Sequence, residues 1–93
     1  MFDRILNRMR EKIRRRRYIM TYHARREMHY DDLTIYDIER GILTGRILKR
    51  QKDKITNEWK YRIKGKTVEG SKVEVIAKIG PTDKLVIITV YAV

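Results

Sequence analysis

The chain has no cysteine, and among its 93 residues it has one proline, one tryptophan and one phenylalanine. Without cysteine it can form neither a disulfide framework nor a thiolate metal site, and it suits a reducing compartment. Its longest apolar run, residues 85–93, is interrupted by Thr89, whereas a membrane-spanning helix needs about 20 apolar residues. No signal-peptide pattern opens the sequence, so we expect a cytoplasmic protein that does not span a membrane.

A chain of 93 residues fits a single domain, 1–93, because domains typically have roughly 100–150 residues. It buries one modest core, which excludes a large cofactor fold and an active site divided between domains. Positive charge predominates, because 23 lysines and arginines against 12 acidic residues give a net charge of +11. This balance favours polyanionic partners such as RNA, the ribosome or an acidic protein.

Basic charge is concentrated at the two ends of the chain. Residues 1–17 carry a net charge of +6, residues 18–45 a net charge of −2 and residues 46–93 a net charge of +7. Apolar residues of the first block recur at helical spacing, namely Phe2, Ile5, Leu6, Met9 and Ile13. We therefore predict a basic amphipathic helix over 1–17, whose last turn, Arg14–Arg17, suits the negative end of the helix dipole.

Residues 18–45 read as a helical region with two short helices. Thr21 can cap the first, which ends near His29. Thr34 followed by Asp37 resembles a capping box for the second, and Gly45 stands where a C-cap glycine is expected. The apolar face of this second helix comprises Ile35, Ile38, Ile42 and Leu43.

From Arg46 onward the apolar period changes to two, which predicts a β-sheet over 46–93. Apolar and charged residues alternate over 59–64 and 73–79, and the β-branched residues of 86–91 indicate a central strand. Gly80–Asp83 is a turn. We expect an α+β fold in which N-terminal helices pack on one face of a mostly antiparallel sheet.

His23 and Glu27 are the first candidates for chemistry. On a helix they are four residues apart and share a face, and a carboxylate beside an imidazole orients it for general acid or base catalysis. The alternative is that His23 caps the helix or packs under the sheet and Glu27 screens nearby arginines. His23 and His29 are six residues apart, which does not stack them on one helical face, so we expect no metal site and no cofactor.

A basic strand interleaved with aromatic residues is the second candidate. Cations that neutralise phosphates alternate with Trp59 and Tyr61 along this strand: Lys60, Arg62, Lys64 and Lys66. The aromatic side chains point to the opposite face, so the alternative is that they are core and the lysines a solvated edge. The Arg-rich first helix can bind RNA or an acidic partner, but its apolar stripe first serves core packing.

Thr89 and Tyr91 share a face of the last strand, where a tyrosine can donate a proton or simply pack. The sequence lacks a glycine-rich phosphate loop, a nucleophile elbow and a serine or cysteine triad pattern.

Several of these residues form a pattern that resembles the DUF4258 family. It opens with Tyr18-x-x-Thr21-x-His23-Ala24-x-x-Glu27-Met28, as in a Glu-Met subgroup, and continues through Leu33-Thr34-x-x-Asp37-Ile38 to Gly45. Further matches are Tyr61-x-Ile63-x-Gly65-Lys66-Thr67, Val73-x-Val75-Ile76 and the closing Ile88-Thr89-Val90-Tyr91. The resemblance covers about residues 18–91.

That family is grouped by resemblance with the RelE-like toxins. The resemblance implies a RelE-like fold and a toxin-like endoribonuclease, acting on RNA or ribosome-bound mRNA and neutralised by an acidic antitoxin. By position it makes His23 the acid/base candidate and places Thr89 and Tyr91 beside the cleft.

Metal-independent RNA cleavage needs a base for the 2′-hydroxyl, an acid for the leaving 5′-oxygen and cations around the transition state. His23 with Glu27 can supply the base and Tyr91 the acid, while Arg26, Arg62 or Lys64 supplies positive charge. Two other readings use the same surface without catalysis: an RNA- or ribosome-binding module, and a protein-interaction module for an acidic partner.

Overall fold

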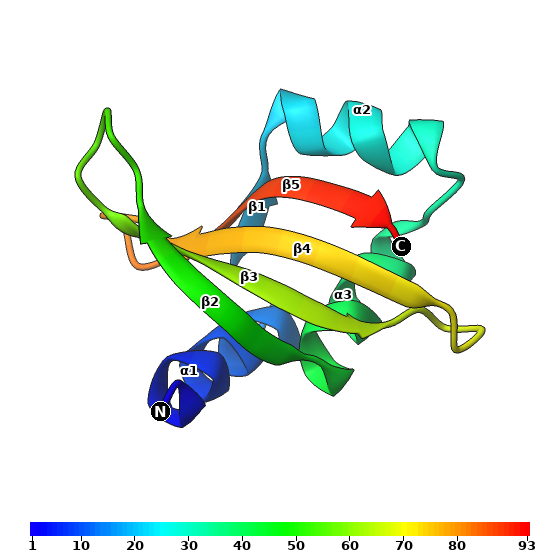
Figure 1. Ribbon diagram of the computed structural model, residues 1–93, viewed down its shortest axis with the longest axis horizontal. Helices are drawn as coiled ribbons and strands as arrows, with labels where there is room; N and C mark the ends of the chain where they lie inside the picture. Colours follow the sequence, from blue (N-terminus) through cyan, green and yellow to red (C-terminus); the bar gives the residue numbers. More distant parts are fainter.

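The computed structural model describes residues 1–93 as three helices and a five-stranded sheet (Figure 1). In chain order the elements are α1 (Asp3–Arg14), β1 (Tyr18–Met20), α2 (Tyr22–Tyr30), α3 (Ile35–Thr44), β2 (Arg46–Lys52), β3 (Trp59–Lys66), β4 (Lys72–Ile79) and β5 (Leu85–Ala92). The strand order is β1-β5-β4-β3-β2, with β1 parallel to β5 and every other pair antiparallel. The expected α+β fold, with helices preceding a mostly antiparallel sheet, is confirmed.

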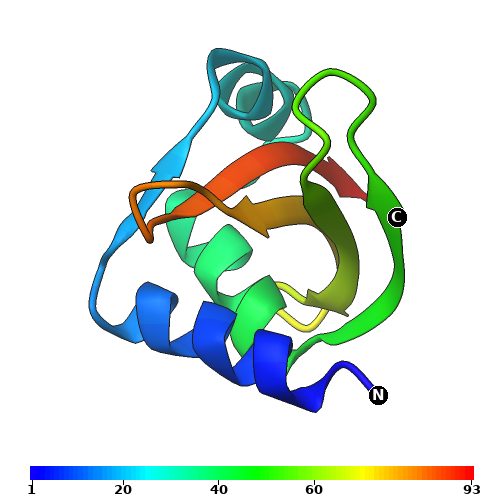
Figure 2. The ribbon, with the colours of Figure 1, turned by 90° about the vertical axis from the view of Figure 1, so that its left-hand side faces the viewer.

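Two helices and the curved sheet enclose the core (Figure 2). α3 packs on β3 and β4, and α1 packs against α3 and β5. The completely buried side chains come from both layers: Met9, Ile38, Ile42, Ile63, Val73, Val75, Leu85, Ile87 and Val90. α2 lies apart from these two helices, along the side of β5 that faces away from β4 (Figure 1).

The apolar stripe of α1 packs into the core as expected, with Leu6, Met9 and Ile13 buried. The helix ends at Arg14, however, so the four arginines do not form its last turn, and Arg16 is left-handed at φ 55°. One cation of α1 has a structural role, because the Arg10 guanidinium donates to the carbonyl of Gly45 at 2.8 Å. A cation at this position stabilises the carbonyl end of α3.

Both helix starts in the region 18–45 are confirmed. The Thr21 hydroxyl accepts from the backbone N–H of Ala24, and Thr34 forms a capping box with Asp37. The same region also contains β1, which we did not predict, because three residues are too few to show a strand period. β1 is fixed by its pairing with β5 and by the hydroxyl of Tyr18, which donates to Glu39 of α3.

Three glycines let α3 approach β3 at backbone distance. A Cβ on Gly65 would lie 1.9 Å from the carbonyl oxygen of Gly41, and a Cβ on Gly45 would lie 2.4 Å from the same oxygen. Gly45 is therefore not the left-handed C-cap that its position suggested: its backbone is extended at φ −87°, ψ 177°. Glycine is required there because a Cβ would collide with neighbouring backbone, and not because the backbone conformation is a special one.

No helix of the structure combines the length and the apolar character needed to cross a membrane.

We predict that Gly65→Ala lowers the free energy of unfolding by about 2–4 kcal/mol, because the new methyl group collides with backbone that cannot move without shifting α3. Urea unfolding measures this change. The neighbouring Lys66→Ala, at an exposed position, is the matched control and should cost about 0.5 kcal/mol or less. Equal stability of the two variants would show that the α3–β3 contact is looser than described.

Candidate functional site

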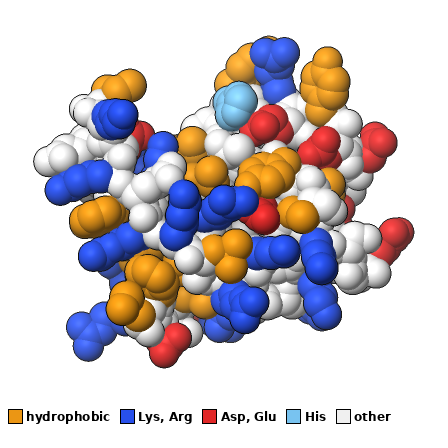
Figure 3. Space-filling model, viewed as in Figure 1, with side chains coloured by type: hydrophobic (Ala, Val, Ile, Leu, Met, Phe, Trp, Pro, Cys, Tyr) orange, Lys and Arg blue, Asp and Glu red, His pale blue; other side chains and the backbone are white.

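The face of the sheet turned away from α3 carries a dense set of cations. Along β3, Tyr61, Ile63 and Gly65 face α3, and the residues between them face the other way. Strand register adds Arg46 and Lys49 from β2 and Lys72 from β4 to these cations. We call this surface the basic face; its β3 members are Lys60, Arg62, Lys64 and Lys66. Figure 3 shows lysine and arginine side chains across the strands of this side.

One buried carboxylate lies among these cations. Glu74 of β4 is 4% exposed, and it pairs in register with Lys64 on one side and with Tyr91 on the other. Its Oε1 accepts a hydrogen bond from Nε of Arg62 and a second, of 2.6 Å, from the Tyr91 hydroxyl. We call Arg62, Glu74 and Tyr91 the β-face triad. It joins three adjacent strands, β3, β4 and β5.

The hydrogen bonds of the triad shift the pKa values of all three of its members. The hydrogen bond from Arg62 lowers the pKa of Glu74, and the bond to Glu74 raises the pKa of Tyr91. The pKa of Arg62 is raised in turn, mainly by its bond to Glu74. At neutral pH the triad therefore consists of a cation, an anion and a protonated phenol. Tyr91 is consequently a weak acid and a well-held hydrogen-bond donor.

His23 and Glu27 come together on α2 as expected. Nε2 of His23 lies 3.0 Å from Oε1 of Glu27, and the imidazole is 66% exposed. The distance is short enough for a hydrogen bond but the alignment is not, so none forms and Oε1 of Glu27 remains buried without a donor. The exposure of His23 excludes the alternative that it packs under the sheet.

The pair projects from the side of α2 that faces away from β1. Arg25 and His29 line a hollow with β1, and a step of two residues turns a helix by about 200°, which places His23 and Glu27 on the opposite side. Arg26 is exposed and lies 5.8 Å from the ring centre of Tyr22 on the same helix.

The structure brings together some of the candidates and not others. Tyr91 and Arg62 share the triad, and Thr89, opposite Ile76, lies on the same sheet face as Tyr91. No hydrogen bond or ion pair joins His23 or Glu27 to the triad, although α2 packs along β5. Glu74 was missed in the sequence, where it stood as one charged residue of an alternating strand. The sequence did contain one indication: alternation along β4 places this acidic residue on the same sheet face as the cations.

Trp59 does not belong to the core, unlike Tyr61 on the same strand face. Its side chain is 41% exposed, and the Arg50 guanidinium lies 4.2 Å from its ring centre. Lys52, its cross-strand partner, lies 5.1 Å from the ring centre. The alternative that both aromatic residues are core therefore holds for Tyr61 and not for Trp59, because the indole stays partly exposed under the cations of β2.

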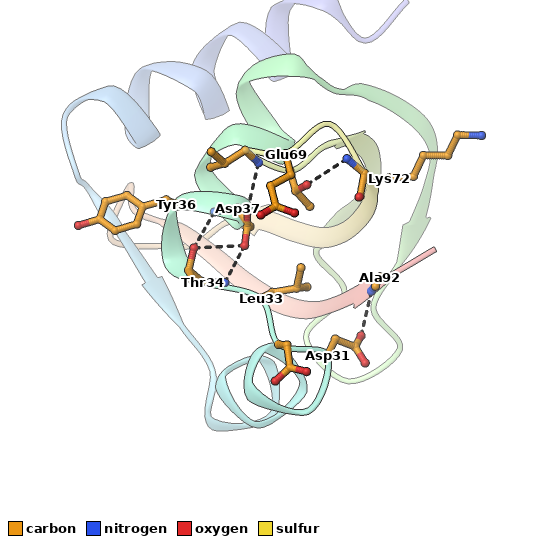
Figure 4. Close-up of a pocket in the computed structure, with 12 residues that line it drawn as sticks. Asp31, Leu33, Thr34, Tyr36, Asp37, Glu69, Lys72 and Ala92 are labelled. Atoms are coloured by element: carbon orange, nitrogen blue, oxygen red, sulfur yellow. Dashed lines mark hydrogen bonds between the residues drawn. The ribbon is translucent and has the colours of Figure 1, made fainter.

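A hollow of about 760 Å³ lies beside the first turn of α3 (Figure 4). It is lined by four acids, Asp31, Asp32, Asp37 and Glu69. Two of them hold backbone: Asp31 accepts from the N–H of Ala92 at 2.9 Å, and Asp37 from that of Val68 at 3.0 Å. No three His, Asp or Glu side chains group as metal ligands would. Lys72 of the basic face also lines the hollow, but the four acids give it the wrong charge for a polyanion.

A family model matches most of the chain. The family is described as "Domain of unknown function (DUF4258)", and the match spans residues 20–92, from the last residue of β1 to the last residue of β5. No curated protein and no solved structure gives a significant match.

The lowered pKa of Glu74 predicts an acid dependence of stability. Its stabilising effect is complete above the ordinary value of 4.5 and is lost as the pH falls through the lower pKa of the folded state. Glu74→Gln should therefore be less stable than wild type at pH 6, and the difference in the free energy of unfolding should narrow towards pH 3. Urea unfolding at these two pH values, which lie about 1.5 units on either side of 4.5, measures the difference. A constant difference would show that the pKa of Glu74 is the same in the folded and the unfolded protein.

Proposed function

The chain belongs to the DUF4258 family, and from this membership and the basic face we propose that it is a RelE-like, toxin-type endoribonuclease that cleaves RNA without a metal ion. An acidic antitoxin would be its protein partner and RNA, free or on the ribosome, its substrate. The observation that carries the proposal is the position of the cations of β3, which occupy one sheet face and leave the other to the core.

Binding follows from the charge of this face. The cations of β2, β3 and β4 line up across adjacent strands, where they can neutralise successive phosphates of an RNA strand. Two carboxylates lie among them, and each is paired with a cation: Glu74 with Arg62, and Glu58, just before β3, with Lys78 of β4. Arg26 on α2 would extend the same positive field towards His23.

Cleavage would follow the usual course of 2′-hydroxyl attack. A base removes the 2′-hydroxyl proton, the oxygen attacks phosphorus, and the bond to the 5′-oxygen breaks as that oxygen takes up a proton from a water molecule. The products are a 2′,3′-cyclic phosphate and a 5′-hydroxyl. His23, with Glu27 3.0 Å away, is the base, and Arg62 and Lys64 offset the developing negative charge. Tyr91, whose pKa is raised, suits donation to a phosphoryl oxygen better than full proton transfer.

We predict that His23→Ala lowers the rate of RNA cleavage by a factor of about 10²–10⁴, the usual worth of a general acid or base, with RNA affinity within about twofold. End-labelled mRNA, with and without translating ribosomes and without added metal, reports cleavage. His29→Ala is the matched control, because this histidine lies on the other side of the same helix. If both histidine variants cut as fast as wild type, His23 is not the base.

The basic face predicts the salt dependence of binding. Replacing Lys60, Lys64 and Lys66 by glutamine should reduce the slope of log affinity against log salt by about 2, since each neutralised phosphate of a single strand contributes about 0.7. Fluorescence anisotropy with single-stranded RNA measures it. Replacement of three exposed arginines of α1 and its C-cap (Arg4, Arg14 and Arg15) removes the same charge elsewhere. An equal reduction in both triple variants would contradict a localised interface.

A second candidate function is a non-catalytic module that binds RNA or a ribosome through the same face. The misaligned His23–Glu27 contact favours it, because a base is normally oriented by a hydrogen bond. It predicts salt-sensitive binding and intact RNA. Stable association with an acidic protein, without affinity for RNA at moderate salt, would instead indicate a protein-interaction module.

A further inference from the structure

We infer that Glu74 is a positioning residue of the candidate site, which orients Arg62 and Tyr91 towards one phosphate of the bound RNA. This inference rests on the proposed function, to which it adds a residue that contacts no substrate. Glu74 lies under the basic face, and both bonds that it accepts end on the same oxygen, Oε1.

The burial of Glu74 needs a reason. A carboxylate that is 4% exposed has lost most of its hydration, and the folded protein must replace it with hydrogen bonds and opposite charge. An apolar residue at this strand position would avoid that cost. The sheet instead keeps the anion and surrounds it with cations from β3, including Lys64 directly opposite.

The hydrogen bond to Glu74 is made by Nε of the Arg62 guanidinium rather than by its two terminal nitrogens. The Tyr91 hydroxyl lies close to the same guanidinium. The Arg62 side chain is 38% exposed, which leaves room for a ligand to approach it. A guanidinium fixed at Nε presents its terminal N–H groups in one orientation, which suits two-point binding of phosphate oxygens.

The same carboxylate fixes the Tyr91 hydroxyl. The 2.6 Å bond keeps the phenol protonated and holds its oxygen beside Arg62. Since one oxygen, Oε1, accepts from both side chains, movement of Glu74 changes the placement of both. Arg62 and Tyr91 therefore act as one unit, and the loss of Glu74 should resemble the combined loss of their orientation.

RNA binding and cleavage, measured together on Glu74→Gln, distinguish this positioning role from a purely electrostatic one. Glu74→Gln removes a negative charge from the basic face, so RNA binding should be unchanged or tighter. Cleavage at saturating RNA should nevertheless fall by about 10–100-fold, because the terminal groups of Arg62 and Tyr91 are no longer held. Glu69→Gln is the matched control: it removes the same charge at an exposed residue of the β3–β4 loop, whose side chain makes no hydrogen bond.

A double-mutant cycle tests whether Glu74 acts through Tyr91. If it does, Tyr91→Phe should cost much less in the Glu74→Gln background than in wild type. Additive losses, or Glu74→Gln cleavage within twofold of wild type, would overturn the inference. Glu74→Asp, which keeps the charge but shortens the side chain, should also lose cleavage and serves if Glu74→Gln does not fold by circular dichroism.

A measurement without RNA separates this inference from the proposed function. NMR titration of ¹³C-labelled tyrosine, with Tyr91 assigned from Tyr91→Phe, should show the pKa of Tyr91 falling towards 10.0 in Glu74→Gln and staying raised in Glu69→Gln. An unchanged pKa would overturn the triad. If the titration gives the expected shift and wild type cuts no RNA, the endoribonuclease proposal fails and the inferred catalytic role of Glu74 fails with it, while the triad stands as an arrangement that orients Arg62 for binding.

Discussion

The backbone contact between α3 and β3 is the constraint on which the arrangement of the molecule depends. Gly65 of the strand lies so close to Gly41 of the helix that a Cβ on Gly65 would collide with the helix backbone, and a Cβ on Gly41 would collide with the Val73 side chain of β4. Because the helix lies flat on the strand there, Ile38 and Ile42 reach the centre of the sheet and are fully buried. The position of α3 in turn determines where α1 packs, and Arg10 connects the two helices at the end of α3.

The same constraint divides β3 into two faces of different character. A strand held against a helix on one side must present its alternate residues to the other side, and in β3 these are all cations. The core and the candidate interface are therefore built from neighbouring residues of a single strand. Glu74 and Tyr91 extend this arrangement over the next two strands, where a buried anion is compatible with the fold only because cations surround it.

Much of this fold could be predicted from local sequence signals. The capping residues Thr21 and Thr34 mark the starts of α2 and α3, and alternation identifies the long strands. What could not be predicted depends on contacts distant in the chain. β1 exists because Tyr18–Met20 pairs with β5. Gly45 has an extended backbone instead of the left-handed one of a glycine C-cap, and it lies directly against β3.

The candidate site, like the fold, could be predicted in part from the sequence. The spacing of His23 and Glu27 was sufficient to bring them together on a helix, and the alternation of β3 was sufficient to place its cations on one face. Glu74 could not be recognised, because its burial results from strand pairing with β3 and β5. The misalignment of His23 and Glu27 likewise depends on rotamers, which spacing does not determine.

The folding unit is larger than the part of the chain that the family model describes. That match begins at Met20, yet the preceding residues supply α1, nearly all of β1 and the buried side chains Leu6, Met9 and Ile13. A chain shortened to residues 20–92 would expose the apolar side of α3 and the first half of β5 to water. Such a surface favours association with other chains, so a chain expressed from that boundary is expected to aggregate.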